Sequence, residues 1–175
     1  MVKKIVGTGV LLVLALALQA GVKMYTLKSP DGKVKLEVTA GQGIAYSLFY
    51  DGRLLLKPSR IALHTDLPEA DHWENIRITG TKQRHVSETV QAPFYRVKEF
   101  GIDCNELELR LNNGFSLLMR AYNDGMAYRF VAGRKGEMTV VEERAEFNFA
   151  DDFEAYIPYS TNPKDPWNMA FQNFY

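Results

Sequence analysis

Strict alternation of apolar and polar residues is the feature of this sequence that most limits its fold. Residues 33–39 read KVKLEVT, in which Val34, Leu36 and Val38 alternate with charged or hydroxyl side chains. Successive side chains of a β-strand point to opposite faces, so this pattern predicts a strand with one buried and one solvated face. Residues 106–111, ELELRL, repeat the alternation. Because helical periodicity is almost absent after the first 20 residues, the chain is predicted to be all-β.

Turn-forming residues separate these runs at short intervals. Residues 29–32, SPDG, and 112–114, NNG, predict turns, and Asp51-Gly52 predicts a two-residue hairpin loop. Residues 120–130, RAYNDGMAYRF, contain a second Asp-Gly dipeptide, so Asp124 and Gly125 are predicted to form the loop of another tight hairpin. Many strands joined by short turns predict an antiparallel β-sandwich.

The predicted hairpin at residues 124 and 125 would place Arg120 directly opposite Arg129. Like charges in that arrangement destabilise a sheet. Carboxylates between the two arginines would turn the repulsion into an ion-pair network. Acidic residues are available on the neighbouring predicted strands: Glu106, Glu108, Glu142 and Glu143. We favour this structural interpretation over a sugar-binding or catalytic role for the arginines.

The first 20 residues, MVKKIVGTGVLLVLALALQA, have the pattern of a secretory signal peptide. Two lysines precede an apolar run from Ile5 to Leu18, which is shorter than the roughly 20 residues of a membrane-spanning helix. The predicted mature domain covers residues 22–175, and the protein is expected to be exported to the periplasm or the cell exterior. For a cleavage after Ala20, Leu18 occupies the minus-three position, where a small residue is expected, so the exact site stays open. An uncleaved anchor is the alternative.

Charge and cysteine content exclude several classes of protein. Basic and acidic residues both number 21, so no net field attracts nucleic acid or an acidic membrane. Cys104 is the only cysteine, so the chain has no intramolecular disulfide. Its neighbourhood is that of a strand, and a buried, unreactive thiol is favoured over a reactive one.

The usual catalytic arrangements are missing from the sequence. The three histidines lie far apart, and there is neither a phosphate-binding glycine loop nor a nucleophile elbow. Two pairs of adjacent carboxylates occur, Glu142-Glu143 and Asp151-Asp152. Adjacent strand residues point to opposite faces, so neither pair would flank a glycosidic bond if it lay in a strand. No residue of this chain is predicted to be catalytic.

Residues 155–175, AYIPYSTNPKDPWNMAFQNFY, are rich in proline, amide and aromatic side chains. This composition predicts a long ordered loop, of the kind that lines sites where sugar faces stack on aromatic rings. Alternatively, Trp167, Phe171 and Phe174 cover a sheet edge or dock on another domain. Both alternatives stay open. Because the aromatic run continues to Tyr175, further protein is expected to follow it.

Several motifs in order along the chain resemble the N-terminal domain of glycoside hydrolase family 97. They are SPDGKVKLEV, YDGRLLLKPSRIAL, CNELELRL, RAYNDGMAYRF, and AYIPY followed by FQNFY. The resemblance runs from about Ser29 to Tyr175, and RAYNDGMAYRF is its most specific part.

The resemblance implies an exported, exo-acting α-glucosidase or α-galactosidase. Its N-terminal domain would be a β-sandwich of the super-sandwich type, followed by a (β/α)8 catalytic barrel that acts on α-linked oligosaccharides. A barrel takes roughly 250 residues, so this chain cannot contain one and is expected to be catalytically silent. The domain would brace the barrel and form one wall of the sugar and calcium site with residues 155–175. A free-standing, exported carbohydrate-binding module is the alternative.

The resemblance also implies a Ca²⁺ ion beside the substrate. Family members supply a glutamate ligand from the segment that matches FQNFY, and Gln172 occupies that position here. A glutamine carbonyl is a ligand that Ca²⁺ accepts, but it brings no charge and therefore weaker binding. Asn173 is a second candidate contact, and Asn173 and Trp167 are the candidate sugar-binding residues.

Overall fold

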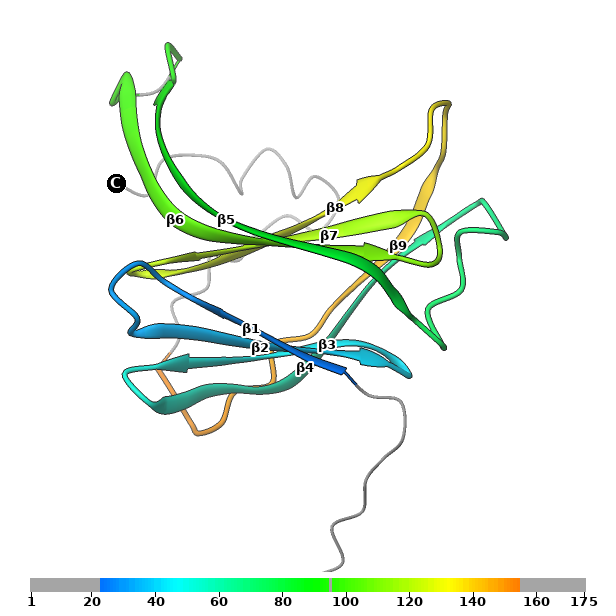
Figure 1. The fold of residues 1–175 in the computed structure, drawn as a ribbon, viewed down its shortest axis with the longest axis horizontal. Helices are drawn as coiled ribbons and strands as arrows, with labels where there is room; N and C mark the ends of the chain where they lie inside the picture. The colour runs from blue at the N-terminus through cyan, green and yellow to red at the C-terminus, as the bar shows by residue number, and fades with distance from the viewer. Residues whose placement is uncertain (1–22, 95, 155–175) are drawn as a thin grey trace, which may run out of the picture.

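The computed structural model describes residues 23–94 and 96–154 (Figure 1). This part of the chain contains strands and no helix, and therefore no helix that is long and apolar enough to cross a membrane. The predicted signal peptide, residues 1–20, and the aromatic segment, residues 155–175, lie outside the described residues. The nine strands are β1 (Lys23–Lys28), β2 (Val34–Gly41), β3 (Gly43–Tyr50), β4 (Arg53–Thr65), β5 (Ile78–Gln91), β6 (Glu99–Leu111), β7 (Phe115–Tyr122), β8 (Gly125–Ala132) and β9 (Val140–Ala145).

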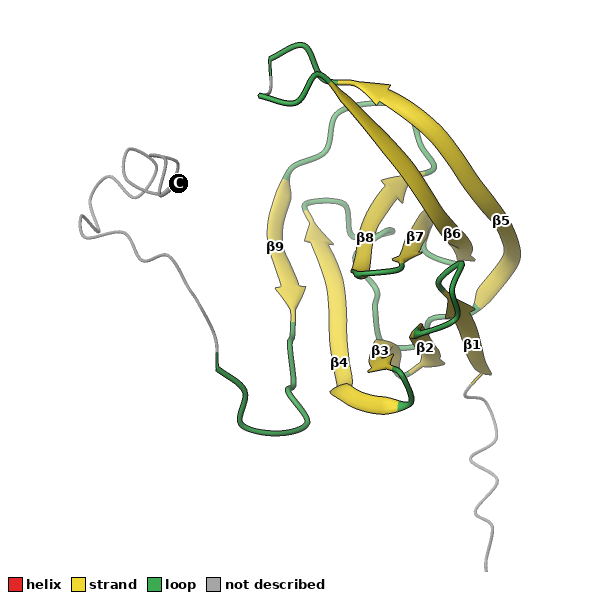
Figure 2. Ribbon diagram, turned by 90° about the vertical axis from the view of Figure 1, so that its left-hand side faces the viewer, coloured by secondary structure: helices red, strands yellow, loops and turns green. Residues whose placement is uncertain are grey.

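The strands form two antiparallel sheets that pack face to face, which confirms the predicted all-β sandwich (Figures 1 and 2). One sheet has the order β1-β2-β3-β4-β9, and the other has the order β5-β6-β7-β8. Alternate residues of β2 and β7 are buried, as the period-two pattern requires. Leu36 and Val38 of β2 belong to one hydrophobic core with Leu117 and Met119 of β7.

The turn between β3 and β4 confirms the hairpin predicted at Asp51-Gly52. Tyr50 pairs with Arg53, and the two loop residues have φ values of +48° and +80°. Both values lie in the left-handed region that a tight hairpin loop requires. The turn before β7 likewise ends at Gly114, with φ of +85°.

The predicted register of the β7–β8 hairpin is wrong. Tyr122 pairs with Gly125, so the loop consists of Asn123 and Asp124, and Arg120 lies opposite Ala127 instead of Arg129. The observed pairing differs from the predicted one by two residues, a shift that leaves every side chain on the same face. Apolar alternation therefore does not distinguish the two registers. In the observed register Asn123 lies in the loop, where its Oδ1 accepts a hydrogen bond from the backbone N–H of Asp31 at 3.1 Å.

The two hairpins are expected to differ in how replacement of their glycine with alanine changes the free energy of unfolding. Gly52→Ala is expected to lower the free energy of unfolding by about 1 kcal/mol or more, because alanine is strained at positive φ. Gly125 does not have positive φ, and a Cβ atom there would meet nothing within 4 Å, so Gly125→Ala should leave the stability unchanged or raise it slightly. Urea unfolding of the two variants tests the difference. Equal losses in both would contradict the turn geometry.

Strands β5 and β6 are the longest pair and continue past the rest of the sandwich as an arm (Figures 1 and 2). In Figure 1 the arm bends away from the sheet that contains β1. The outer face of the β5–β8 sheet, which points away from the other sheet, is therefore concave at this end.

Candidate functional site

The outer face of the β5–β8 sheet carries the most unusual charged residue of the described part. Glu106 of β6 is only 4% exposed, whereas the other charged residues of residues 23–94 and 96–154 are at least partly solvated. The sheet register pairs it with Arg84 of β5 on one side and with Arg120 of β7 on the other. Glu106 and Arg120 alternate with the core residues Leu107 and Met119 along their strands, so the periodicity that builds the core places them on the opposite face, and the register adds Arg84 to that face.

Each oxygen of the Glu106 carboxylate accepts a hydrogen bond from one arginine. Arg84 Nε donates to Oε1 and Arg120 Nε donates to Oε2, both at 2.7 Å. The predicted network of arginines and carboxylates therefore exists, but with different members. Arg129 lies opposite Leu118 and is not one of them.

The other predicted acidic partners have separate roles. Glu108 accepts a long hydrogen bond, 3.5 Å, from Ser116 Oγ, and Glu143 accepts one from Tyr128 at 3.1 Å. Burial and the charge of Glu143 raise the pKa of the Tyr128 hydroxyl to about 12. Glu142 lies opposite His64 in the other sheet. Sequence reasoning missed Arg84, although its position two residues before the buried Val86 places it on the same face of β5.

The two arginines keep Glu106 ionised. Burial by itself would raise the pKa of this carboxyl, but the hydrogen bonds and charges of Arg84 and Arg120 outweigh burial and lower the pKa below its ordinary value. The hydrogen bond to Glu106 in turn raises the pKa of Arg120. A general acid requires a protonated carboxyl with a raised pKa. The cluster is therefore suited to hold three strands together and not to transfer protons.

This shift predicts a pH dependence of stability. Because the folded-state pKa of Glu106 is lower than the ordinary value of 4.5, the network stabilises the fold above about pH 4.5 and is lost as the pH falls through the folded-state pKa. Glu106→Gln removes this titration. The difference in unfolding free energy between the wild type and Glu106→Gln, measured in urea, should be largest near pH 7 and shrink below pH 4.5. A difference that is constant with pH would contradict the assignment.

Cys104 lies next to this cluster on the same face of β6. Its side chain is fully buried, and burial raises the pKa of the thiol. A thiolate is the reactive form of cysteine, so both observations support the prediction of an unreactive thiol.

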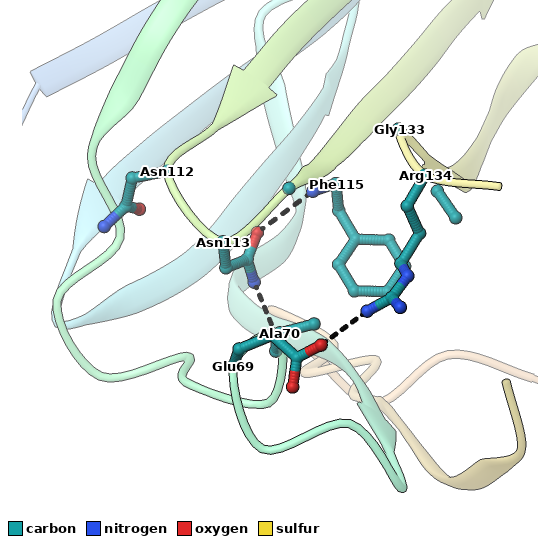
Figure 3. A pocket seen from close by; sticks show the side chains of 9 residues that line it. Glu69, Ala70, Asn112, Asn113, Phe115, Gly133 and Arg134 are labelled. Atoms are coloured by element: carbon teal, nitrogen blue, oxygen red, sulfur yellow. Dashed lines mark hydrogen bonds and ion pairs between the residues drawn. The ribbon is translucent and has the colours of Figure 1, made fainter. Parts of the chain in front are cut away.

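A pocket of about 340 Å³ opens where the loop after β4 meets the β6–β7 and β8–β9 turns (Figure 3). Arg134 and Glu69 form an ion pair of 2.6 Å at its rim. Inside, Asn113 Nδ2 donates to the carbonyl of Ala70 and its Oδ1 accepts from the backbone N–H of Phe115, both at 3.3 Å. Both ends of the Asn113 amide are therefore already hydrogen-bonded within the protein. The pocket is part of the contact between these loops, and this amide has little capacity left to bind a ligand.

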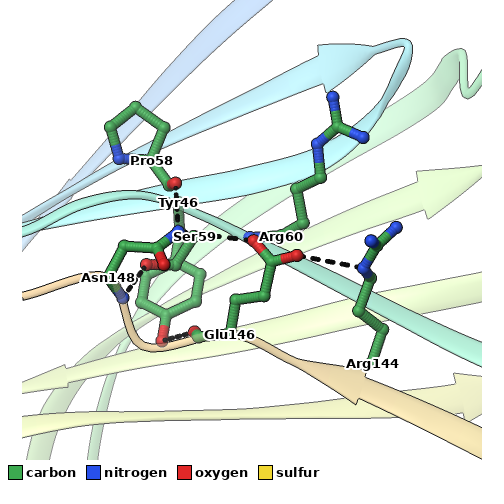
Figure 4. A network of polar contacts seen from close by, with 7 residues as sticks. All are labelled: Tyr46, Pro58, Ser59, Arg60, Arg144, Glu146 and Asn148. Atoms are coloured by element: carbon green, nitrogen blue, oxygen red, sulfur yellow. Dashed lines mark hydrogen bonds and ion pairs between the residues drawn. The ribbon is translucent and has the colours of Figure 1, made fainter.

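A second polar network attaches the segment after β9 to β4 (Figure 4). Glu146 Oε2 accepts from the backbone N–H of Arg60 at 3.0 Å, and Arg144 Nε lies 3.0 Å from Oε1. The bond to Arg60 is the main cause that lowers the pKa of Glu146. Ser59 is fully buried and its Oγ accepts from the backbone N–H of Asn148 at 2.9 Å. These contacts also serve the fold.

The three residues predicted to form the sugar and calcium site, Trp167, Gln172 and Asn173, lie outside the described residues. Within residues 23–94 and 96–154, no three His, Cys, Asp or Glu side chains are grouped so that they could hold a metal ion. The described residues therefore contain no cluster of carboxylates of the kind that commonly holds Ca²⁺.

Comparison with known proteins decides the family. The sequence pattern described as the N-terminal region of glycosyl hydrolase 97 matches residues 27–175, almost the whole chain. The chain belongs to glycoside hydrolase family 97. Within this family, it is similar to the retaining alpha-galactosidase of Bacteroides thetaiotaomicron, with 39% identity over 160 residues. That match covers 90% of this chain and 24% of the relative, so the family 97 domain described here spans about a quarter of that protein.

Solved structures agree with the fold of this family 97 domain. A beta-arabinopyranosidase superposes with a TM-score of 0.63 and 25% identity, over 71% of this chain and 21% of the other. A family 97 enzyme from Pseudoalteromonas sp. strain K8, in complex with panose, superposes with a TM-score of 0.60 and 19% identity, over 73% and 20% of the two chains. The sandwich is thus the N-terminal domain of family 97 glycosidases.

Proposed function

We propose that this chain is the non-catalytic N-terminal domain of an exported, retaining α-galactosidase. It would brace a (β/α)8 catalytic barrel and contribute one wall of the sugar site. The observation that carries the proposal is the 39% identity to a retaining alpha-galactosidase over 90% of the chain. The family 97 enzyme that binds panose is only 19% identical, which makes it the weaker guide to substrate.

The electrostatics of the described residues support a non-catalytic role. A glycosidase needs one carboxylic acid with a raised pKa to protonate the leaving oxygen and a second carboxylate to attack the sugar or activate water. The described carboxyl groups with displaced pKa values are all displaced downward: Asp31, Asp66, Glu69, Glu106 and Glu146. The acid and the nucleophile are therefore assigned to the barrel. For a retaining enzyme the two carboxyl groups would lie about 5 Å apart, and the nucleophilic carboxylate alone would form a covalent bond to the sugar while the other acts as acid and then as base.

Enzyme assays with matched proteins test this function. The complete coding sequence in which this chain occurs should yield a protein that hydrolyses 4-nitrophenyl α-galactoside faster than the α-glucoside, with retention of anomeric configuration. The 175-residue chain alone should hydrolyse neither. Hydrolysis by the chain alone, or a longer protein without α-glycosidase activity, would overturn the proposal. Calorimetric titration of the chain with melibiose and maltose tests the alternative, because measurable affinity would favour a free-standing carbohydrate-binding module.

Calcium binding is proposed to depend on Gln172 together with carboxylates of the barrel. A neutral carbonyl oxygen contributes less to Ca²⁺ affinity than a carboxylate does. In the full-length protein, Gln172→Glu is therefore expected to tighten Ca²⁺ binding by about tenfold in titration calorimetry. Gln42→Glu, which makes the same change at an exposed residue between β2 and β3, is the matched control and should leave the affinity unchanged. Equal or weaker binding by Gln172→Glu would remove this residue from the site.

A further inference from the structure

The outer face of the β5–β8 sheet is buried at its centre although no described strand packs on it. The β1–β4 and β9 strands lie on the opposite side of this sheet (Figures 1 and 2). The outer face of a two-layer sandwich is ordinarily solvated. Yet the exposed fractions of Cys104, Glu106 and Val86 on this face are 0%, 4% and 7%. Arg84 and Arg120 flank Glu106, and Tyr122 contacts Cys104, so side chains of the face itself account for part of this burial.

The same face continues as an apolar row along the β5–β6 arm. Val86 pairs with Cys104, and Val90 pairs with Phe100 further along the arm. Side chains two residues apart share one face of a strand, so Ile102 joins this row. Val90 and Phe100 are 39% and 42% exposed. Glu88, which pairs with Ile102, is exposed and lies on this face as well, so the concave side of the arm from Val86 to Val90 is mainly but not wholly apolar.

The opposite side of the arm is polar. Ser87 pairs with Asp103, Thr89 with Gly101, and Gln91 with Glu99. Both Ser87 and Asp103 are exposed. This contrast between the two sides is typical of a surface that packs against another segment on one side only.

We propose that residues 155–175 of the same chain pack against this concave face. The described chain ends at Glu154, and the 21 residues that follow span up to about 70 Å when extended, so the segment can reach any part of the sheet. The segment supplies the apolar side chains that such a face requires: Tyr156, Ile157, Tyr159, Trp167, Met169, Phe171 and Phe174. A second copy of the chain and another domain are the competing occupants.

Packing of this kind would anchor the segment that is proposed to form one wall of the sugar site. A pocket wall contributes to recognition only when its position is fixed relative to the rest of the site. This consequence rests on the proposed function, whereas the packing itself does not. The test below uses neither sugar nor Ca²⁺, so its failure is distinct from failure of the proposed function.

Thiol labelling of Cys104 can report whether residues 155–175 pack on this face. Cys104 lies on the face, and the sequence contains no other cysteine. The rate at which a thiol reagent labels Cys104 should be slow in the full chain. Trp167→Ser combined with Phe171→Ser should accelerate labelling at least about tenfold, because release of the segment exposes the thiol. Phe94→Ser is the matched control, since Phe94 is 99% exposed and lies in the loop at the end of the arm, and its labelling rate should equal that of the wild type.

Two further measurements separate local release from other causes. In the double variant the labelling rate should depend only weakly on urea, because release of one segment exposes little surface. Ile102→Asp, which changes the face and leaves the segment intact, should accelerate labelling in the same way, and Ser87→Asp on the other side of the arm should not. An unchanged rate in the double variant, a steep urea dependence, or a wild-type rate that falls with protein concentration would overturn the proposal.

Discussion

Replacement of Trp73 with alanine is expected to lower the free energy of unfolding by about 3–5 kcal/mol. Trp73 lies in the irregular loop after β4 but is only 6% exposed. Its ring lies 5.9 Å from that of Phe115 and 5.2 Å from that of Phe130, centre to centre. Its Nε1–H donates to the carbonyl of Leu63 at 3.1 Å. Alanine would leave a large cavity between the sheets and remove the hydrogen bond to a main-chain carbonyl.

Urea unfolding of the chain measures this loss, with Glu74→Ala as the matched control. Glu74 is the next residue of the same loop and is exposed, so its replacement should change stability by less than about 0.5 kcal/mol. Trp73→Phe keeps part of the ring contact and should fall between the two. A loss below about 1 kcal/mol for Trp73→Ala would show that the loop is not part of the core.

Removal of Glu106 is the second large effect. Glu106→Ala is expected to cost about 2–3 kcal/mol near pH 7, because it leaves Arg120 without its carboxylate partner in a site where the arginine side chain is only 24% exposed. The cost is smaller than the 3–5 kcal/mol that is typical of a fully buried pair, since the side chain of Arg84 is 52% exposed and regains water.

The control for Glu106→Ala is Glu108→Ala, two residues along the same strand and on the same face. Glu108 makes only a long contact to Ser116, so its removal should cost less than about 0.5 kcal/mol. When Arg120 has already been replaced with alanine, Glu106→Ala should lower the free energy of unfolding by less than it does in the wild type. In that background no Arg120 side chain is left to lose its carboxylate partner. Equal costs in both backgrounds would show that the two residues do not interact.

The fold class was predictable because its signal is local. The alternation in β2 is read from residues 33–39, and the three positions that it assigns to the core, Val34, Leu36 and Val38, are buried. The Asp51-Gly52 turn was predictable from the preference of this dipeptide for positive φ. The same dipeptide at Asp124-Gly125 does not form the predicted loop, so this local preference does not decide the turn by itself. The family resemblance, read from ordered motifs, was confirmed over residues 27–175.

The Glu106 cluster and part of the core were not predictable from local patterns. Arg84 and Glu106 are 22 residues apart in sequence, and only the pairing of β5 with β6 brings them within 2.7 Å. The buried state of Trp73 follows from Phe115 and Phe130, which come from the other sheet. A polar loop sequence gives no sign of this contact.

The sequence by itself determined that the chain is all-β and where most turns lie, because alternation of buried residues and turn-forming residues are properties of short segments. It also indicated the family, through motifs that occur in order along the chain. Tertiary structure decided the β7–β8 register, since a shift of two residues preserves both faces and the alternatives differ only in contacts between segments, such as the hydrogen bond from Asp31 to Asn123. It also decided which of several nearby carboxylates joins Arg120, because a charge is stabilised in a buried site only where its partners converge on it in space.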